Sequence, residues 1–266
     1  MTLKKQLGII VCFAIIVLCI GFFYLLTFKP KPNPPSAKGV SITKEQKVKY
    51  PEDYTIVIVG DSMTEALGNS TELKQYLSDY YKKSFEILNY GFGSTNVLSL
   101  VDRIAKETEH GRKFMPISKI DYDLILIESF GENPPSELPL EQGLKRQNEE
   151  LDKAIATLQS SHPRGKVVFV ATISPNKTIF AKNQVDLTSD VRAKWVQERV
   201  AYIQNHIDYA NSHNIPVINI FKDSLLENGD GNPNYISTQD FIHPSPKGII
   251  FISRKIADFI YQEKIL

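Results

Sequence analysis

Three residues of this chain carry the side chains that nucleophilic acyl chemistry requires. Ser62 supplies a hydroxyl in the segment Gly60-Asp61-Ser62, and Asp240 lies three residues before His243 near the carboxyl end. A histidine beside a serine hydroxyl can accept its proton, and a carboxylate beside that histidine holds the required tautomer. The residue types therefore predict attack of Ser62 on an acyl carbon, with His243 as the base and Asp240 as the group that orients it.

An acyl-transfer site also needs hydrogen-bond donors for the oxyanion that develops during attack. Gly93 lies in the glycine-containing segment 89–94, and Asn133 ends the segment 131–133. The backbone amides of Ser62 and Gly93 and the side-chain amide of Asn133 are the predicted donors. Because the glycine segment is compact, Gly91 remains an alternative source of the second backbone amide.

These segments follow short apolar runs or precede the last amphipathic stretch. Runs rich in β-branched residues predict five strands buried on both faces, and helical spacing predicts five helices between and after them. Strands alternating with helices indicate an α/β fold with a mostly parallel five-stranded sheet covered on both sides. The predicted strands are 54–59, 85–88, 124–127, 167–170 and 217–220, and the predicted helices are 71–83, 96–113, 141–161, 189–212 and 246–262.

Each candidate residue also has a purely structural interpretation. Ser62 followed by Glu65 fits a capping box at a helix start. His243 could be a loop histidine, because Ser245 and Pro246 explain the start of the last helix without catalysis. Asn133 and Gly93 could be ordinary turn residues. The presence of all the segments, each at a predicted strand end or before the last helix, favours the catalytic interpretation.

Four segments, taken in order, resemble the SGNH (GDSL-type) hydrolase family. They read GDS at 60–62, NYGFGS at 89–94, GEN at 131–133 and DFIH at 240–243, and they span nearly all of the chain after residue 50. Met63 stands where the family name has leucine, and Pro134 stands where many members have aspartate. The resemblance implies a three-layer, flavodoxin-like α/β/α sandwich without a metal or other cofactor. It also implies that serine, glycine, asparagine and histidine are the catalytic groups.

Composition excludes several other classes of function. The formal net charge is +1, so no basic field predicts nucleic-acid binding. The two cysteines, Cys12 and Cys19, both lie in the apolar N-terminal run, which leaves no thiolate ligands in the rest of the chain. The histidines other than His243 lack partners at metal-ligand spacing. We therefore expect no metal, no cofactor and no nucleic-acid partner.

The N-terminal region predicts a membrane anchor. Residues 7–28 contain no charged side chain, and as a helix they would be long enough to cross a bilayer. A cleaved signal peptide is the main alternative, but this apolar run is longer than such a peptide requires. We predict a cytoplasmic tail at 1–6, the anchor at 7–28, a proline-rich linker at 29–50 and the hydrolase domain at 51–266. Because lysines flank both ends of the anchor, an extracytoplasmic domain is a hypothesis.

The substrate is the least constrained prediction. A domain held outside the membrane would meet cell-surface glycans and lipids, and a polar loop at 174–188 is expected to line the pocket. We therefore predict a serine-dependent carbohydrate O-acetylesterase. Lysophospholipid or other lipid ester hydrolysis, O-acyl transfer by the same residues, and a non-catalytic surface-binding domain remain alternatives.

Overall fold

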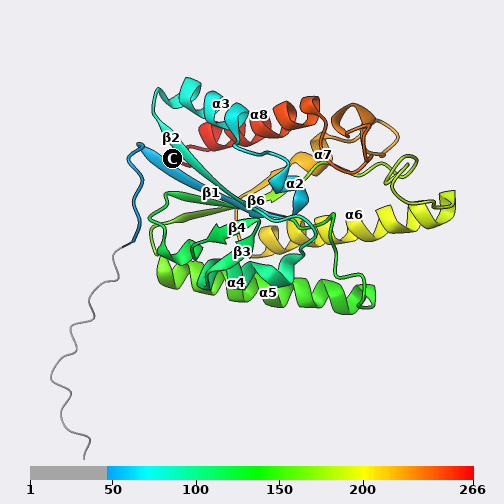
Figure 1. The fold of residues 1–266 in the computed structure, drawn as a ribbon, viewed down its shortest axis with the longest axis horizontal. Coiled ribbons are helices and arrows are strands. Elements are labelled where there is room, and N and C mark those ends of the chain that lie inside the picture. Colours follow the sequence, from blue (N-terminus) through cyan, green and yellow to red (C-terminus); the bar gives the residue numbers. More distant parts are fainter. Residues whose placement is uncertain (1–46) are drawn as a thin grey trace, which may run out of the picture. The chain divides into compact units, whose positions relative to one another are not determined.

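The computed structural model describes residues 47–266 of the chain (Figure 1). The predicted cytoplasmic tail and anchor, and most of the predicted linker, lie outside the described residues. Within residues 47–266, every helix is too short or too polar to cross a membrane.

A parallel five-stranded sheet forms the centre of the fold, as the sequence predicts. Its strand order is β2-β1-β5-β6-β7. The chain moves from β1 outward to β2 and then returns to the other side of β1, so the order reverses between β1 and β5. Ligands of such sheets bind in the crevice at the carboxyl ends of the strands on either side of this reversal. The strands are β1 (Tyr54–Gly60), β2 (Phe85–Gly91), β5 (Leu124–Glu128), β6 (Lys166–Ala171) and β7 (Val217–Asn219).

Alternating side chains of the strands build two separate cores. Ile56 and Ile58 of β1 pack with α3 (Thr71–Tyr81) and α8 (Pro246–Gln262). Val57 and Val59 point to the opposite face, which is covered by α4 (Leu100–Ala105), α5 (Leu140–Ser161) and α6 (Ser189–Ser212). Figure 1 shows the two groups of helices on opposite faces of the sheet. A continuous apolar strand is therefore explained by burial on both sides.

The predicted helix at 96–113 is wrong over most of its length. A 3₁₀ turn, η1 (Val97–Ser99), leads into α4, and the rest forms an antiparallel hairpin of β3 (Thr108–His110) and β4 (Arg112–Phe114). Gly111 connects the two strands with φ +66°, a conformation that glycine adopts without strain. Phe114 then packs edge-on against Tyr90 and Phe92. Contacts with β2 and the loop that follows it thus make the extended conformation of this segment more stable than the predicted helix.

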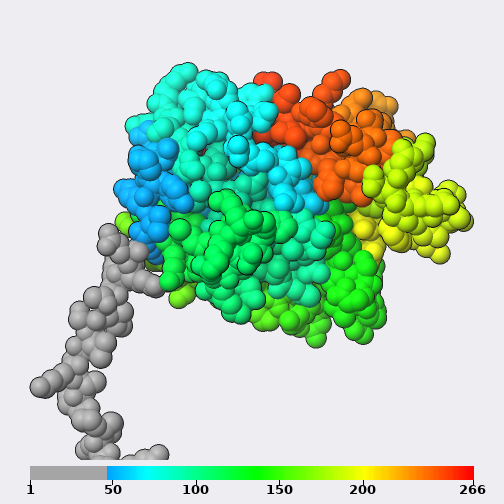
Figure 2. Space-filling view, in the orientation of Figure 1, coloured from blue at the N-terminus to red at the C-terminus, as the bar shows by residue number. Residues whose placement is uncertain are grey.

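The remaining elements are short and lie near the strand ends. The predicted strand at 217–220 ends at Asn219, because the Asn219 side chain accepts a hydrogen bond from Lys222 N at 2.9 Å and so starts α7 (Ile220–Asp223). In Figure 2 the loop before α8 lies between the α2 region and the start of α6. The other short elements are α2 (Ser62–Glu65), η2 (Ile117–Lys119) and η3 (Pro233–Tyr235).

Candidate active site

Ser62 is the first residue of α2, directly after the sharp turn that ends β1. The helix is capped by Asp61 and not by Ser62, because Met63 N donates to Asp61 Oδ1 at 2.8 Å. The capping-box interpretation of Ser62 is therefore wrong, and its hydroxyl remains available for chemistry. Gly60 is required at this turn, since a methyl group placed there would lie 2.7 Å from the Cβ of Glu128.

The glycine segment after β2 lies beside the nucleophile. A methyl group placed on Gly93 would lie 3.7 Å from the Cβ of Ser62. Gly91 packs against the backbone of α2, and its amide already donates to Asn89 Oδ1 at 2.8 Å. The Asn89 side chain also donates to Thr64 O at 2.9 Å, which ties β2 to α2. Gly93 is thus better placed than Gly91 to offer an amide to a group bound at Ser62.

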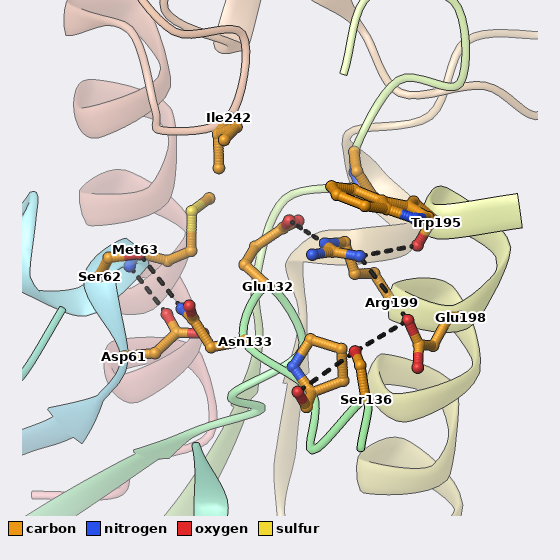
Figure 3. Close-up of polar contacts among 12 residues, drawn as sticks. Asp61, Ser62, Met63, Glu132, Asn133, Ser136, Trp195, Glu198, Arg199 and Ile242 are labelled. Atoms are coloured by element: carbon orange, nitrogen blue, oxygen red, sulfur yellow. Dashed lines mark hydrogen bonds and ion pairs between the residues drawn. The ribbon is translucent and has the colours of Figure 1, made fainter. Parts of the chain in front are cut away.

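Asn133 reaches the same position from the opposite side of β1. It follows β5, and its Nδ2 donates to Ser62 Oγ at 3.4 Å (Figure 3). The Asn133 backbone is held in a turn, where its amide donates to Phe130 O at 3.3 Å. Gly93 and Asn133 therefore both lie beside Ser62, in the segments that follow the strands on either side of β1.

Asp240 and His243 form the expected pair on the loop before α8. His243 Nδ1 lies 2.8 Å from Asp240 Oδ2, and Asp240 Oδ1 accepts from the backbone amides of Ile242 and His243 at 2.9 and 3.0 Å. Partial burial alone would raise the pKa of Asp240, but the hydrogen bonds from the imidazole and the two amides hold that pKa below its usual value. Asp240 is therefore an ionised orienting group, and it leaves Nε2 as the reactive imidazole nitrogen.

The two halves of the site are not hydrogen-bonded to each other. Within the described part of the chain, no hydrogen bond joins His243 to Ser62. Figure 3 shows the side chain of Ile242, the neighbour of His243, pointing toward Met63, the neighbour of Ser62. Catalytic hydrogen bonds of empty sites are often long and shorten when substrate binds.

Two buried carboxyl groups lie beneath the nucleophile turn. Glu128, at the end of β5, accepts from Ser129 Oγ at 2.6 Å and from the amide of Asp61 at 3.3 Å. Burial, together with the nearby carboxyl of Asp61, raises the pKa of Glu128 well above its usual value, and burial also raises the pKa of Asp61. The nearness of the two buried carboxyl groups therefore disfavours ionisation of both at once.

Arg103 of α4 joins the strand ends that carry the site. Its fully buried guanidinium donates to Gly60 O at 2.5 Å and to Tyr90 O at 2.8 Å, and it also bonds the hydroxyl of Thr95. Burial lowers the pKa of Arg103 to about 10, so it stays charged at neutral pH. Arg103 therefore holds the nucleophile turn and the glycine segment together. This role cannot be predicted from the sequence, because an arginine within an expected helix usually faces solvent.

The hairpin places a second histidine near the nucleophile. His110 of β3 lies 2.8 Å from Glu65 Oε1 and stacks on Phe92 at a centroid distance of 4.7 Å. The other Glu65 oxygen borders Gly93, within 2.5 Å of a methyl group placed there. This pair thus forms one wall of the site. The sequence does not predict this pair, because its pattern favours a helix at His110.

Glu132, next to Asn133, is a third buried carboxyl group. Its closest charged neighbour is Arg199 of α6, whose Nε lies 3.6 Å from Glu132 Oε2. Burial raises the pKa of Glu132 to about 8 despite the attraction of Arg199. Glu132 therefore binds a proton in the folded chain at pH values where an exposed glutamate is ionised.

Replacement of Glu132 by glutamine is expected to reduce the loss of stability as pH rises. Between about 4.5 and about 8 the folded chain keeps a proton on Glu132 that the unfolded chain releases, so the free energy of unfolding falls with rising pH. Glu132→Gln removes this contribution, which is on the order of 5 kcal/mol at most. Urea unfolding at pH 5 and pH 8 measures how much the free energy of unfolding falls between these two pH values. The exposed Glu227→Gln serves as the control, and an equal fall in Glu132→Gln and in wild type would contradict the assignment.

The loop at 174–188, which is predicted to line the pocket, contains side chains that are buried within the protein. Asn176 is buried and donates to Gly231 O at 2.7 Å, while its Oδ1 accepts from Thr178 N at 2.9 Å. Phe180 is also buried and packs with Val196 of α6. These side chains hold the loop in place, and the sequence could not distinguish that role from substrate contact.

Comparison with known proteins agrees with this geometry. The model of the GDSL-like Lipase/Acylhydrolase family matches residues 58–249. The protein YpmR of Bacillus subtilis (strain 168), described as uncharacterized, is 23% identical over 242 residues, which are 86% of this chain and 89% of that protein.

Solved structures share the fold at low sequence identity. The lipase/acylhydrolase from Enterococcus faecalis superposes with a TM-score of 0.56 and 16% identity, over 79% of this chain and 96% of that one. The acetyl xylan esterase AlAXEase superposes with a TM-score of 0.55 and 16% identity, over 77% and 99%. The family match begins within β1, ends within α8, and contains every predicted site residue. The chain therefore belongs to the GDSL-like lipase/acylhydrolase family of carboxylic ester hydrolases.

Proposed function

We propose that the chain hydrolyses esters through an acyl-enzyme on Ser62. His243 Nε2 removes the hydroxyl proton while Ser62 Oγ attacks the ester carbonyl carbon. The amides of Ser62 and Gly93 and the side chain of Asn133 bind the oxyanion. His243 then gives its proton to the departing alcohol, and a water molecule repeats the sequence to release the acid and restore Ser62.

The observation that carries this proposal is the convergence of donors on Ser62. Asn133 Nδ2 lies 3.4 Å from Ser62 Oγ, and Gly93 borders Ser62 from the other neighbouring strand. Donors fixed before the reaction stabilise developing charge without reorganisation. The imidazole of His243, already oriented by Asp240 at 2.8 Å, supplies the base.

We further propose that the ester is an acetyl group on a carbohydrate. Polar pairs flank the nucleophile: Glu65 with His110 on one side, and Glu132 with Arg199 on the other. A long acyl chain lying on the partly exposed pair of Glu65 and His110 would remove these groups from water without offering hydrogen bonds, which is unfavourable. A small acyl group attached to a hydroxyl-rich alcohol avoids that cost. AlAXEase, a structural neighbour, is an acetyl xylan esterase.

The substrate proposal is tested with the purified full chain and three esters. Acetylated xylan, lysophosphatidylcholine and a p-nitrophenyl acetate standard are compared by kcat/KM. We expect acetate release from the glycan to exceed fatty-acid release from the lysolipid at least about ten-fold, a difference of about 1.4 kcal/mol in transition-state binding. Preference for the lysolipid would instead identify a lipid esterase, and acetyl transfer to an added sugar in place of acetate release would identify an acyltransferase.

Replacement of Asn133 by alanine is expected to lower kcat by about 10²–10³-fold while the chain remains folded. The substitution removes one oxyanion donor and leaves Ser62, His243 and Asp240 in place. Steady-state kinetics on p-nitrophenyl acetate measures it, with Asn211→Ala on the exposed surface of α6 as the control. A kcat within two-fold of wild type would exclude Asn133 from the oxyanion site.

We also propose that residues 7–28 anchor the chain and that the hydrolase domain faces the cell exterior. The support is the length of the apolar run, which suits a bilayer. Protease treatment of intact cells tests the orientation. Digestion of the domain is the expected result, and full protection would contradict it.

A further inference from the structure

A cluster of aromatic and charged side chains lies beside the proposed oxyanion donor. We call it the Trp195 cluster, and it consists of Trp195, Arg199, Glu132 and Glu198, which Figure 3 shows, together with Phe180. The Arg199 guanidinium lies 4.7 Å from the ring centre of Phe180 and 5.5 Å from that of Trp195. Phe180 is buried, whereas Trp195 is 37% exposed. The cluster therefore presents one aromatic ring to solvent, held in place by an arginine behind it.

The polar groups of this cluster have unused hydrogen-bonding capacity. The Arg199 side chain is only 14% exposed, yet within residues 47–266 its one hydrogen bond runs from Nη1 to Trp195 O at 3.0 Å. Its Nε and both carboxyl oxygens of Glu132 have no hydrogen-bond partner in that range. Buried polar groups are nearly always hydrogen-bonded. Because these three atoms are themselves buried, hydroxyl groups of a ligand would meet only the part of the Arg199 side chain that stays exposed.

The Trp195 cluster lies close to the nucleophile both along the chain and in space. Glu132, which contacts Arg199, is followed by Asn133, which reaches Ser62 Oγ at 3.4 Å. Figure 3 shows Glu132 between the indole of Trp195 and the Ser62–Met63 segment. A group bound on Trp195 would therefore lie next to an ester held at Ser62, where the alcohol portion of a substrate belongs.

The charges of the cluster disfavour an anionic ligand. Arg199 is accompanied by Glu132 at 3.6 Å and Glu198 at 3.9 Å, so one positive group faces two carboxyl groups. The net charge is neutral when Glu132 is protonated and negative when it is ionised. A phosphate or carboxylate would gain little from such a site, while neutral hydroxyls can both donate and accept.

We propose that Trp195 and Arg199 form a subsite for a neutral pyranose ring in the alcohol portion of the ester. The exposed face of the indole stacks on the apolar face of the sugar, and the spare guanidinium N–H groups donate to its hydroxyls. Glu132 is a positioning residue that holds Arg199 against the indole. This inference rests on the proposed function, and it names the substrate group that the site selects.

The fluorescence of Trp195 can report ligand binding at this subsite. Trp195 is the single tryptophan among 266 residues, so selectively excited indole emission reports only this position. The full chain carrying Ser62→Ala is titrated with xylotriose, with inorganic phosphate and with lysophosphatidylcholine. A saturable change in emission with xylotriose alone is expected. No change with xylotriose, or an equal change with lysophosphatidylcholine or phosphate, would overturn the subsite.

Two variants separate ligand contact from a structural role. Arg199→Lys keeps the charge but loses the planar set of donors, and it is expected to weaken xylotriose binding about ten-fold. Tyr261→Ala, an exposed aromatic change on α8, is the matched control and should bind as the parent does. Unchanged affinity in a folded Arg199→Lys chain would contradict the proposal.

Kinetics give a second test that does not depend on the reporter. With Ser62 intact, Trp195→Ala should raise KM for acetylated xylotriose about ten-fold with little change in kcat, because binding energy is lost equally from the ground and transition states. A fall in kcat at unchanged KM would reject a binding role. If Ser62-dependent hydrolysis of p-nitrophenyl acetate is found while xylotriose has no effect, the subsite fails and the serine mechanism stands. If hydrolysis survives in Ser62→Ala, the proposed function itself fails.

Discussion

Replacement of Ser62 by alanine lowers kcat/KM for ester hydrolysis by at least about 10⁴-fold, according to the proposed mechanism. The change removes the side-chain oxygen that forms the covalent acyl-enzyme bond. It leaves α2 intact, because Asp61 and not Ser62 caps that helix through the amide of Met63. Steady-state kinetics on p-nitrophenyl acetate measures the loss, and thermal unfolding shows that the fold is retained.

A serine elsewhere on the surface controls for this substitution. Ser160 lies exposed near the end of α5, and Ser160→Ala should leave both kinetics and stability close to wild type. Hydrolysis at the wild-type rate in Ser62→Ala would contradict a covalent mechanism at that residue.

Replacement of Asp240 by asparagine is expected to lower kcat by about 10⁴-fold. The amide oxygen can still accept from the backbone amides of Ile242 and His243, so the loop keeps its shape. The amide nitrogen, however, would face His243 Nδ1 and donate to it. The imidazole would then carry its proton on Nε2, where it cannot accept the proton of Ser62.

Asp208→Asn is the matched control for this loss. Asp208 is exposed on α6 and accepts from Gln204 Nε2 at 2.9 Å, a bond that an asparagine oxygen can also make. Activity of Asp240→Asn within ten-fold of wild type would show that Asp240 does not orient the base.

The sheet and its two cores could be predicted from sequence because they depend on local patterns. Alternation of Ile56 and Ile58 with Val57 and Val59 is sufficient to indicate a strand buried on both faces. The hairpin at 108–114 could not be predicted in the same way. Its conformation depends on the contacts of Phe114 with Tyr90 and Phe92, which are remote in sequence.

In the candidate site, too, some residues can be predicted from local sequence and others only from tertiary contacts. Ser62 and Asn133 lie in recognisable segments at strand ends, and the pair Asp240–His243 lies in a recognisable segment before α8. The preference for Gly93 over Gly91 as the proposed donor depends on the structure, because the Asn89 side chain accepts the hydrogen bond of the Gly91 amide. The groups that support the site, such as Arg103 and Glu128, were missed because their roles arise from burial and tertiary contacts.

Buried ionisable groups are concentrated around the nucleophile. Asp61, Glu128 and Glu132 all have raised pKa values because burial disfavours their charged forms. Arg103 and Arg199 lie next to them, which limits the cost of burial. Such clusters are typical of functional sites, and here they fix the backbone turns that carry Ser62 and Asn133.

Labelling with a fluorophosphonate tests the central claim most directly, because this reagent bonds only to a serine activated by an adjacent base. The purified full chain is treated with the reagent, digested, and the modified residue is located by mass spectrometry. We predict a single adduct on Ser62 that is lost in His243→Ala. Absence of labelling, or an adduct on another serine, would contradict the account of Ser62 as the nucleophile.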